Sequence, residues 1–189
     1  MEKIILASAS PRRRQLLEWA EVPFEVMVRE TDESYPASSP VEEIPVYIAR
    51  NKALAVQKEA GREKTILAAD TVVVLGDRVI GKPQSREDAI RILSDLSGRQ
   101  HRVITGVALL HPSGETAFAD STTVTFHPLT PQQIAFYVDR YKPYDKAGAY
   151  AIQEWIGVVG IQSITGDFYN VMGLPVSRVI KALNDIFAG

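Results

Sequence analysis

The stretch Leu6-Ala7-Ser8-Ala9-Ser10-Pro11-Arg12-Arg13-Arg14 joins an apolar segment to the expected start of a helix. The apolar residues Ile4 to Leu6 predict a buried strand. Ser10 can cap a helix, and Pro11 suits the first helical position, where the backbone N–H has no helical partner to lose. We therefore expect a strand over residues 3–7 and a helix over residues 11–20.

Three arginines, Arg12, Arg13 and Arg14, fill the first turn of this expected helix. A helix N-terminus already carries about half a positive charge, so cations are disfavoured there unless an anion binds among them. Backbone N–H groups at a helix start, together with arginine side chains, are typical of phosphate-binding sites. The alternative is a solvated basic turn without a function.

The composition limits the classes of protein that this chain can represent. It has 189 residues, of which 46% are hydrophobic and 23% charged, with a net charge of −2, as expected for a globular protein. This balance argues against a general nucleic-acid binder. The absence of cysteine excludes disulfides, thiolate metal sites and a cysteine nucleophile. No apolar run has the length of a membrane span or a signal peptide, so we expect a cytoplasmic protein without a membrane partner.

Strands and helices alternate along the rest of the chain, and two pairs of strands form hairpins. The first hairpin turns at Gly76-Asp77, and the second turns near Ser113-Gly114. Hairpins among alternating elements predict a mixed sheet in an α/β fold rather than a purely parallel sheet. We expect strands over residues 23–28, 66–75, 78–81, 101–111, 115–127, 158–164 and 168–171, helices over 41–60, 86–96, 130–141 and from Pro175 onward, and loops over 29–40 and 142–153.

Asp70 lies inside the apolar run Ile66 to Val74. A carboxylate in a buried strand is costly unless it is paired, hydrogen-bonded or bound to a metal. Asp70 is therefore a candidate general base or metal ligand, and the alternative is a structural carboxylate that caps a nearby backbone group. Lys52 stands in the helical row Ile48-Lys52-Val56, which is otherwise apolar. It is either a phosphate contact or a lysine that extends along the apolar face to solvent.

Three further residues gain interest from their surroundings. Lys82 follows the first hairpin, where a two-residue turn places it opposite Thr71, next to Asp70. Glu33, in a polar loop, can serve as a second oxygen ligand for Mg²⁺, which takes one or two carboxylates plus substrate phosphates. Gln153 can donate and accept hydrogen bonds, which suits reading a nucleobase edge. The small residues before Gln153 equally suit close packing of backbone segments.

Several segments resemble the Maf family of nucleoside triphosphate pyrophosphatases, in the order in which that family has them. They begin with the stretch quoted first and span nearly the whole chain. The others are Ala68-Ala69-Asp70-Thr71-Val72-Val73, Gly81-Lys82-Pro83, Leu96-Ser97-Gly98, His101 through Thr105-Gly106, Asp145-Lys146-Ala147-Gly148-Ala149-Tyr150 and Asn170-Val171-Met172-Gly173-Leu174-Pro175.

The resemblance implies one domain over residues 1–189. Its implied fold is similar to that of inosine triphosphate pyrophosphatases, with an elongated mixed sheet, flanking helices and two lobes around a cleft. It also implies hydrolysis of a nucleoside triphosphate to the monophosphate and pyrophosphate, with a divalent metal, Mg²⁺ or Mn²⁺. Alternatives are a purine-directed enzyme of the inosine triphosphate type and a nucleotide-binding regulator of cell division, because the family is associated with septum formation. A homodimer is a further expectation from the family.

The resemblance also assigns roles to particular residues. The general base maps to Asp70, which would bind the metal together with Glu33. Phosphate-handling residues map to Ser8, Arg13, Lys52 and Lys82. Residues linked to the choice of base map to Arg12, Thr71 and Gln153, and this set resembles the branch of the family that acts on dTTP and UTP.

Overall fold

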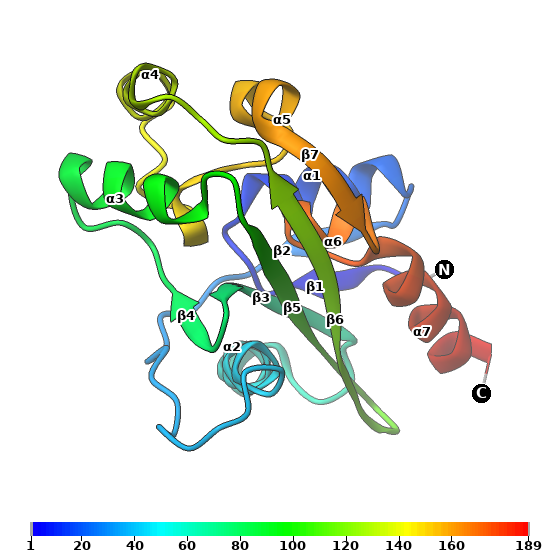
Figure 1. The fold of residues 1–189 in the computed structure, drawn as a ribbon. Coiled ribbons are helices and arrows are strands. Elements are labelled where there is room, and N and C mark those ends of the chain that lie inside the picture. The colour runs from blue at the N-terminus through cyan, green and yellow to red at the C-terminus, as the bar shows by residue number, and fades with distance from the viewer. Residues whose placement is uncertain (1, 189) are drawn as a thin grey trace. The chain divides into compact units, whose positions relative to one another are not determined.

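The computed structural model describes residues 2–188 of the protein (Figure 1). Its helices and strands follow the order expected for most of the chain. The strands are β1 Ile4–Leu6, β2 Phe24–Val26, β3 Ile66–Leu75, β4 Arg78–Ile80, β5 Gln100–His111, β6 Gly114–Phe126 and β7 Ile161–Thr165. The α-helices are α1 Pro11–Trp19, α2 Ile44–Ala60, α3 Arg86–Leu96, α4 Pro131–Tyr141, α5 Trp155–Gly160, α6 Phe168–Met172 and α7 Val176–Ala188, and Ala147–Ala149 forms the 3₁₀-helix η1.

The seven strands form one hydrogen-bonded sheet in the order β2-β1-β3-β5-β6-β7, with β4 paired to β3. β1 runs parallel to both β2 and β3, whereas β4 is antiparallel to β3 and β7 is antiparallel to β6. The predicted mixed α/β architecture is thus confirmed. The pairing of Val73 with Ile80 also confirms the register expected for a two-residue turn at Gly76-Asp77.

The chain divides into two compact units. Unit 1 comprises Met1–Thr71, Thr105–Asp120 and Gly173–Gly189, and unit 2 comprises Val72–Ile104 and Ser121–Met172. Three long strands, β3, β5 and β6, each contribute residues to both units. The expectation of one domain over residues 1–189 stays a prediction.

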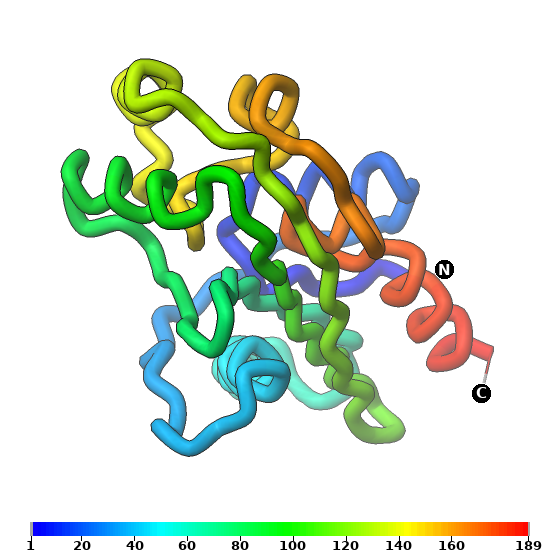
Figure 2. Tube along the Cα trace, viewed as in Figure 1, coloured from blue at the N-terminus to red at the C-terminus, as the bar shows by residue number. Residues whose placement is uncertain are grey.

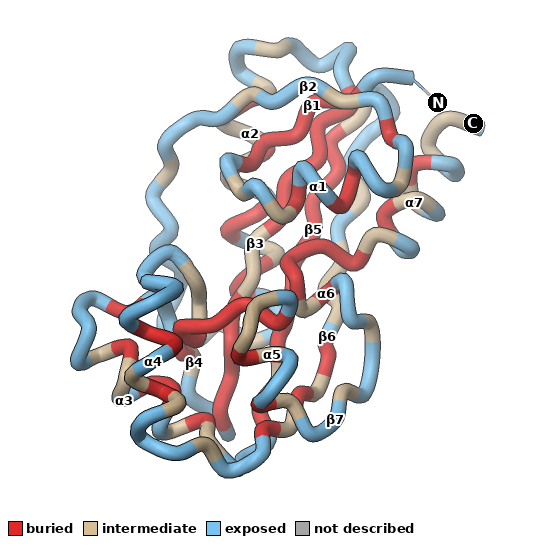
Figure 3. The backbone as a smooth tube through the Cα atoms, turned by 90° about the horizontal axis from the view of Figure 1, so that it is seen from above, coloured by how far each residue is buried: buried red, intermediate tan, exposed pale blue. Residues whose placement is uncertain are grey.

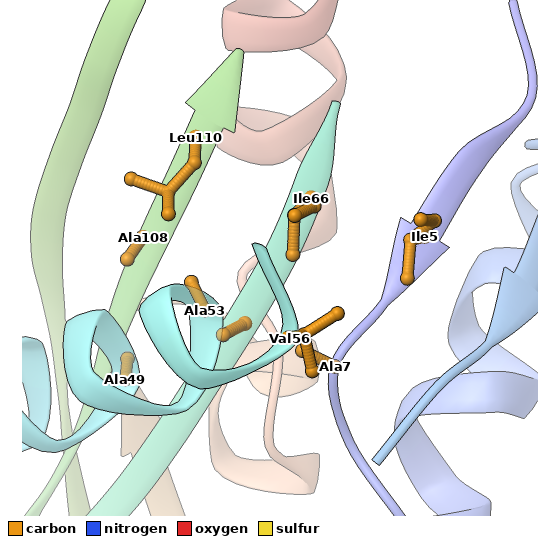
Figure 4. Close-up of a cluster of buried hydrophobic side chains, with 9 residues drawn as sticks. Ile5, Ala7, Ala49, Ala53, Val56, Ile66, Ala108 and Leu110 are labelled. Atoms are coloured by element: carbon orange, nitrogen blue, oxygen red, sulfur yellow. The ribbon is translucent and has the colours of Figure 1, made fainter. Parts of the chain in front are cut away.

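One hydrophobic cluster of unit 1 lies between α2 and the sheet. Figure 4 shows α2 lying over β3 and β5, with the small side chains of Ala49 and Ala53 turned toward the strands. Ile66 and Ala108 meet them from the sheet. Alanines on the buried face let the helix approach the strands closely, which fixes the backbone of α2 relative to β3.

Gly106 in β5 makes this close approach possible. A Cβ atom built at this residue would lie 2.2 Å from the backbone carbon of Pro45 and from the nitrogen of Val46. No side chain fits in that space, so the first turn of α2 rests directly on the backbone of β5. Pro45 occupies the first turn of α2, where a missing N–H costs nothing.

The connection from β2 to α2 has little regular structure, as Figure 2 shows for the chain between residues 27 and 43. Figure 3 shows most of this connection as exposed, in contrast to the buried strand β1. Helix α2 begins at Ile44 rather than at residue 41, so Glu42 and Glu43 precede it. Gly61 ends the helix at a φ of 85°, as expected.

Unit 2 contains two helices with the expected caps. The Ser85 side chain accepts a hydrogen bond from the Asp88 N–H at the start of α3, and Thr130 forms a full capping box with Gln133 at the start of α4. In the same unit, His101 of β5 stacks on Phe126, and its ring shares a hydrogen bond of 2.7 Å with the Tyr150 hydroxyl.

Two predictions near the C-terminal end of unit 2 are wrong. Residues 158–160 belong to helix α5, and the strand β7 begins only at Ile161. The β-branched residues Val158 and Val159 suggested a strand, but Val158 is 83% exposed and packs in no sheet. Residues 168–171 also form a helix, α6, because the carboxylate of Asp167 accepts the Tyr169 N–H at 2.8 Å and starts a helical turn.

Candidate functional site

The link between β1 and α1 places the three arginines in different environments. Helix α1 starts at Pro11 with Ser10 at its N-cap, as expected, but the Ser10 side chain makes no cap hydrogen bond. The Ser10 N–H instead donates to Ser8 Oγ at 3.3 Å. Arg13 is buried, Arg12 is half-buried and Arg14 is exposed. The alternative of a solvated basic turn therefore does not hold for Arg13, because this side chain is buried.

Arg13 is at the centre of a buried hydrogen-bond network in unit 1. Its Nε donates to the Gly173 carbonyl at 2.7 Å, and its two terminal nitrogens donate to Ser8 Oγ at 3.1 Å and to Thr71 Oγ1 at 3.0 Å. Thr71 Oγ1 also lies 2.9 Å from Thr105 Oγ1. Three of the five guanidinium N–H groups are thereby used within the protein.

Burial is the main cause that lowers the pKa of Arg13 to about 10; the nearby Arg12 acts in the same direction, and Asp70 and Glu33 oppose the shift. The guanidinium remains protonated at neutral pH. A positive charge inside the protein is therefore held by three hydrogen bonds and by the field of two carboxylates. It is available to compensate the charge of a bound anion.

A second cluster in unit 1 joins Lys52 to two carboxylates. The Lys52 ammonium lies 2.7 Å from Asp70 Oδ1 and 2.8 Å from Glu33 Oε1. The side chains of Lys52 and Asp70 are only 18% and 15% exposed, whereas Glu33 is 51% exposed. The cost of placing Asp70 in β3 is thus offset by an ion pair. Lys52 does not extend to solvent.

Strand β3 sends its two polar side chains to opposite faces of the sheet. Asp70 and Thr71 are the two residues of β3 that are not buried, and successive side chains of a strand point to opposite faces. Asp70 shares a face with Ile66 and Ala68, which lie under α2, and therefore meets Lys52. Thr71 points to the other face and meets Arg13.

The Glu33 side chain forms an ion pair with Lys52. The residues on either side of it form a local turn, in which Asp32 accepts hydrogen bonds from the Ser34 N–H at 2.8 Å and from the Ser34 hydroxyl at 2.7 Å. The preceding residues and α2 line an open groove of about 820 Å³, so the segment that carries Glu33 is not packed tightly on the helix.

The chemistry of this donor set fits a hard divalent cation. Among residues 2–188, no group of three or more His, Cys, Asp or Glu side chains is arranged to hold a metal ion. Glu33 and Asp70 do converge on one cation, the Lys52 ammonium. Mg²⁺ is commonly held by one or two carboxylates, with substrate phosphates and water completing its shell. Two converging carboxylates therefore suit a metal that arrives with a phosphorylated substrate.

Lys82 and Gln153 lie in unit 2. Lys82 follows the end of β4 and is exposed, and its carbonyl accepts a hydrogen bond from Gln84 at 3.3 Å. Gln153 is exposed in the turn between η1 and α5. Two contacts fix this turn, because the Tyr137 hydroxyl accepts the Ala151 N–H at 3.1 Å and also contacts the Glu154 carboxylate.

Sequence reasoning gave no role to Thr105 and Gly173, although both complete the network around Arg13. Thr105 is fully buried within the apolar strand β5, and a hydroxyl in such a place needs a partner. That signal was present in the sequence. The use of the Gly173 carbonyl had no such signal, because any residue offers a carbonyl.

A family model described as Maf-like protein matches residues 3–186 of this chain. The chain belongs to this family. Within the Maf-like family, a dTTP/UTP pyrophosphatase of Parabacteroides distasonis is 48% identical over 96% of this chain and 94% of its own length. A dTTP/UTP pyrophosphatase of Cytophaga hutchinsonii is 49% identical over 97% of this chain and 84% of its own length.

One solved structure outside these relatives is also similar in part. The Staphylococcus aureus Ham1 protein matches 66% of this chain and 72% of its own, with a TM-score of 0.43 and 16% identity. A likeness this weak supports no conclusion about the Maf-like chain. Within residues 2–188, no helix combines the length and the apolar composition that crossing a membrane requires.

Proposed function

We propose that this Maf-like protein is a nucleoside triphosphate pyrophosphatase that hydrolyses dTTP and UTP to the monophosphate and pyrophosphate. Modified pyrimidine nucleotides are further candidate substrates. The observation that carries the proposal is the Asp70–Lys52–Glu33 cluster, which lies in the same unit as the buried Arg13. The full-length relatives named dTTP/UTP pyrophosphatase supply the substrate class.

The reaction needs a base, a charge-compensating site and a leaving group. In the proposed reaction, the oxygen of a water molecule bonds to the α-phosphorus, and the bond from that phosphorus to the bridging oxygen of the β-phosphate breaks. Asp70 takes the proton of the water. Arg13 and Lys52 stabilise negative charge on the phosphates, and pyrophosphate leaves.

A divalent cation held by Glu33 and Asp70 would supply charge neutralisation for the triphosphate and a lower pKa for a bound water. The protein's own contribution is to place two carboxylates and two cationic side chains in one unit of the structure. Such positioning and electrostatic stabilisation account for most of the catalysis in phosphoryl chemistry.

For the choice of base, the proposal assigns Arg12, Thr71 and Gln153. Thr71 acts in part through Arg13, because its hydroxyl accepts a hydrogen bond from that guanidinium. The half-buried Arg12 and the exposed Gln153 have side chains that can donate hydrogen bonds to the acceptor groups of a pyrimidine ring.

The proposal is tested by pyrophosphate release from a panel of triphosphates with Mg²⁺, Mn²⁺ or EDTA. The panel contains dTTP, UTP, modified pyrimidine nucleotides, ITP and 7-methyl-GTP. We expect release to be greatest with dTTP and UTP and to stop in EDTA. If release is greatest with ITP or 7-methyl-GTP, the proposed reaction stands but the proposed preference for dTTP and UTP is wrong. Nucleotide binding without any release would instead favour a regulator of cell division.

A further inference from the structure

The ammonium of Lys52 stands where the two candidate metal ligands converge. Its distances of 2.7 Å to Asp70 Oδ1 and 2.8 Å to Glu33 Oε1 are those of charge-assisted hydrogen bonds. A hard divalent cation would bind the same carboxylate oxygens at about 2.0–2.6 Å. The ammonium and the metal therefore require the same atoms.

The backbone that carries Lys52 is closely packed on the sheet. Ala49 and Ala53, on either side of it in α2, are fully buried against the sheet, and the helix start rests on the backbone at Gly106. The side chain itself has a flexible four-carbon stem. Any exchange of partners at this site is thus a movement of the Lys52 side chain over a fixed helix.

We infer that Lys52 occupies the cation position in the nucleotide-free protein and competes with the divalent metal for Glu33 and Asp70. The phosphates of a bound nucleotide offer the ammonium a second anionic partner, which frees the carboxylates for the metal. The metal then binds tightly only together with its substrate. This inference rests on the proposed function for the identity of the nucleotide.

If Lys52 competes with the metal, removing its charge should raise the affinity for the metal. If Lys52 only supports the carboxylates, the same change should lower that affinity. A lysine that merely orients Asp70 and Glu33 would weaken metal binding when it is removed. A lysine that competes for them would strengthen metal binding, because its loss leaves two carboxylates without their shared cation. The sign of the change in metal affinity therefore separates the two roles.

The experiment is a titration of the full-length, nucleotide-free protein with Mn²⁺, read by the electron paramagnetic resonance signal of the free ion. We expect Lys52→Met, which keeps an unbranched side chain, to bind Mn²⁺ at least ten-fold more tightly than the unsubstituted protein. Lys52→Gln should change the affinity in the same direction, so a folding defect in one variant does not decide the result. Thermal unfolding checks both variants.

Two controls make the result specific. Lys58→Met removes the same charge from an exposed position of α2 and should leave Mn²⁺ affinity unchanged. Adding Glu33→Gln to Lys52→Met should abolish the gain. Equal or weaker binding by both Lys52 variants overturns the inference, and so does a gain that survives Glu33→Gln.

The outcome is distinguishable from a failure of the proposed function. Tighter Mn²⁺ binding without pyrophosphate release from any triphosphate would retain the competition and remove the proposed reaction. Metal-dependent pyrophosphate release by the unsubstituted protein, without a gain in the Lys52 variants, would retain the reaction and remove the competition.

Discussion

Two charged residues of unit 1, Asp70 and Arg13, lie where water has little access. Each is stabilised by an ion pair or by hydrogen bonds within the protein. Asp70 sits in β3, and Lys52 holds one of its oxygens at 2.7 Å. Arg13 is buried among three hydrogen-bond acceptors. Buried ion pairs of this kind add little stability, because apolar residues often fill the same space at lower cost, and buried charged groups are a feature of functional sites.

The first residue-scale prediction concerns Asp70→Asn. Asparagine keeps the shape of the side chain but cannot take a proton from water. We expect pyrophosphate release from dTTP to fall by about 10²–10⁴-fold. The affinity for a non-hydrolysable dTTP analogue, measured by calorimetry, should change less than about ten-fold.

The matched control is Asp77→Asn, which makes the same change at an exposed turn. It should leave turnover unchanged. Undiminished turnover in Asp70→Asn would remove this carboxylate from the mechanism.

The second residue-scale prediction concerns His101. Burial lowers its pKa from 6.5 to about 4, so the unfolded chain takes up a proton at a higher pH than the native protein does. The native state therefore loses stability as pH falls from about 6.5 to 4. The integrated loss for this one group is about 2 kcal/mol by pH 5.

Urea unfolding of the unsubstituted protein and of His101→Gln at pH 7.5 and pH 5 measures this contribution. Glutamine does not titrate but can still hydrogen-bond Tyr150. We expect the unsubstituted protein to lose about 2 kcal/mol more than the variant on acidification. Equal losses in the two proteins would contradict the assignment.

At the scale of elements, helix α2 positions the cluster because its first turn lies directly on β5. The space between them is too small for a Cβ atom at Gly106, which would lie 2.2 Å from backbone atoms of Pro45 and Val46. The buried alanines Ala49 and Ala53 continue this close contact. Lys52 reaches Asp70 only because the helix is held at this height above the sheet.

Gly106→Ala should therefore push α2 away from β5. We expect the free energy of unfolding to fall by about 3 kcal/mol, since backbone atoms cannot give way as a flexible side chain can. Urea unfolding measures it. Gly81→Ala is the control, because a Cβ atom there meets no atom within 4 Å and the expected change is under about 0.5 kcal/mol. A similar small change in Gly106→Ala would contradict the account.

At the scale of the whole molecule, the candidate residues are distributed over both units. Unit 1 contains Ser8, Arg12, Arg13, Glu33, Lys52, Asp70 and Thr71, and unit 2 contains Lys82 and Gln153. The family model runs through both units, over residues 3–186. The proposed function therefore draws on residues of both units.

The whole-molecule prediction compares one base-choice residue from each unit. We expect Arg12→Ala and Gln153→Ala each to change the ratio of kcat/KM for dTTP to that for ITP by at least about ten-fold, the effect of losing one hydrogen-bonding group to the base. Thermal unfolding should change little, because the Arg12 side chain is half-buried and that of Gln153 is exposed. Unchanged ratios in both variants would remove these residues from the choice of base.

The sequence predicted most elements correctly because their signals are local. Ser85 and Thr130 cap helices through partners three residues away, and the turn at Gly76-Asp77 defines the register of β3 with β4. The failures at α5 and α6 are also local, since β-branched or aromatic residues there suggested strands. Asp167 is a residue type that commonly caps helices, so the sequence did contain a signal for the start of α6.

By itself, the sequence determined the mixed α/β class, most of the elements and the presence of an acid in an apolar strand that requires a partner. Only the tertiary structure decided which partners meet. Lys52 could have extended to solvent, but the close contact of α2 with β5 directs it to Asp70 and Glu33. Arg13 meets the carbonyl of Gly173, 160 residues away. Periodicity and caps depend on near neighbours in the chain, whereas these pairs depend on the order of the strands in the sheet and on the face each side chain takes.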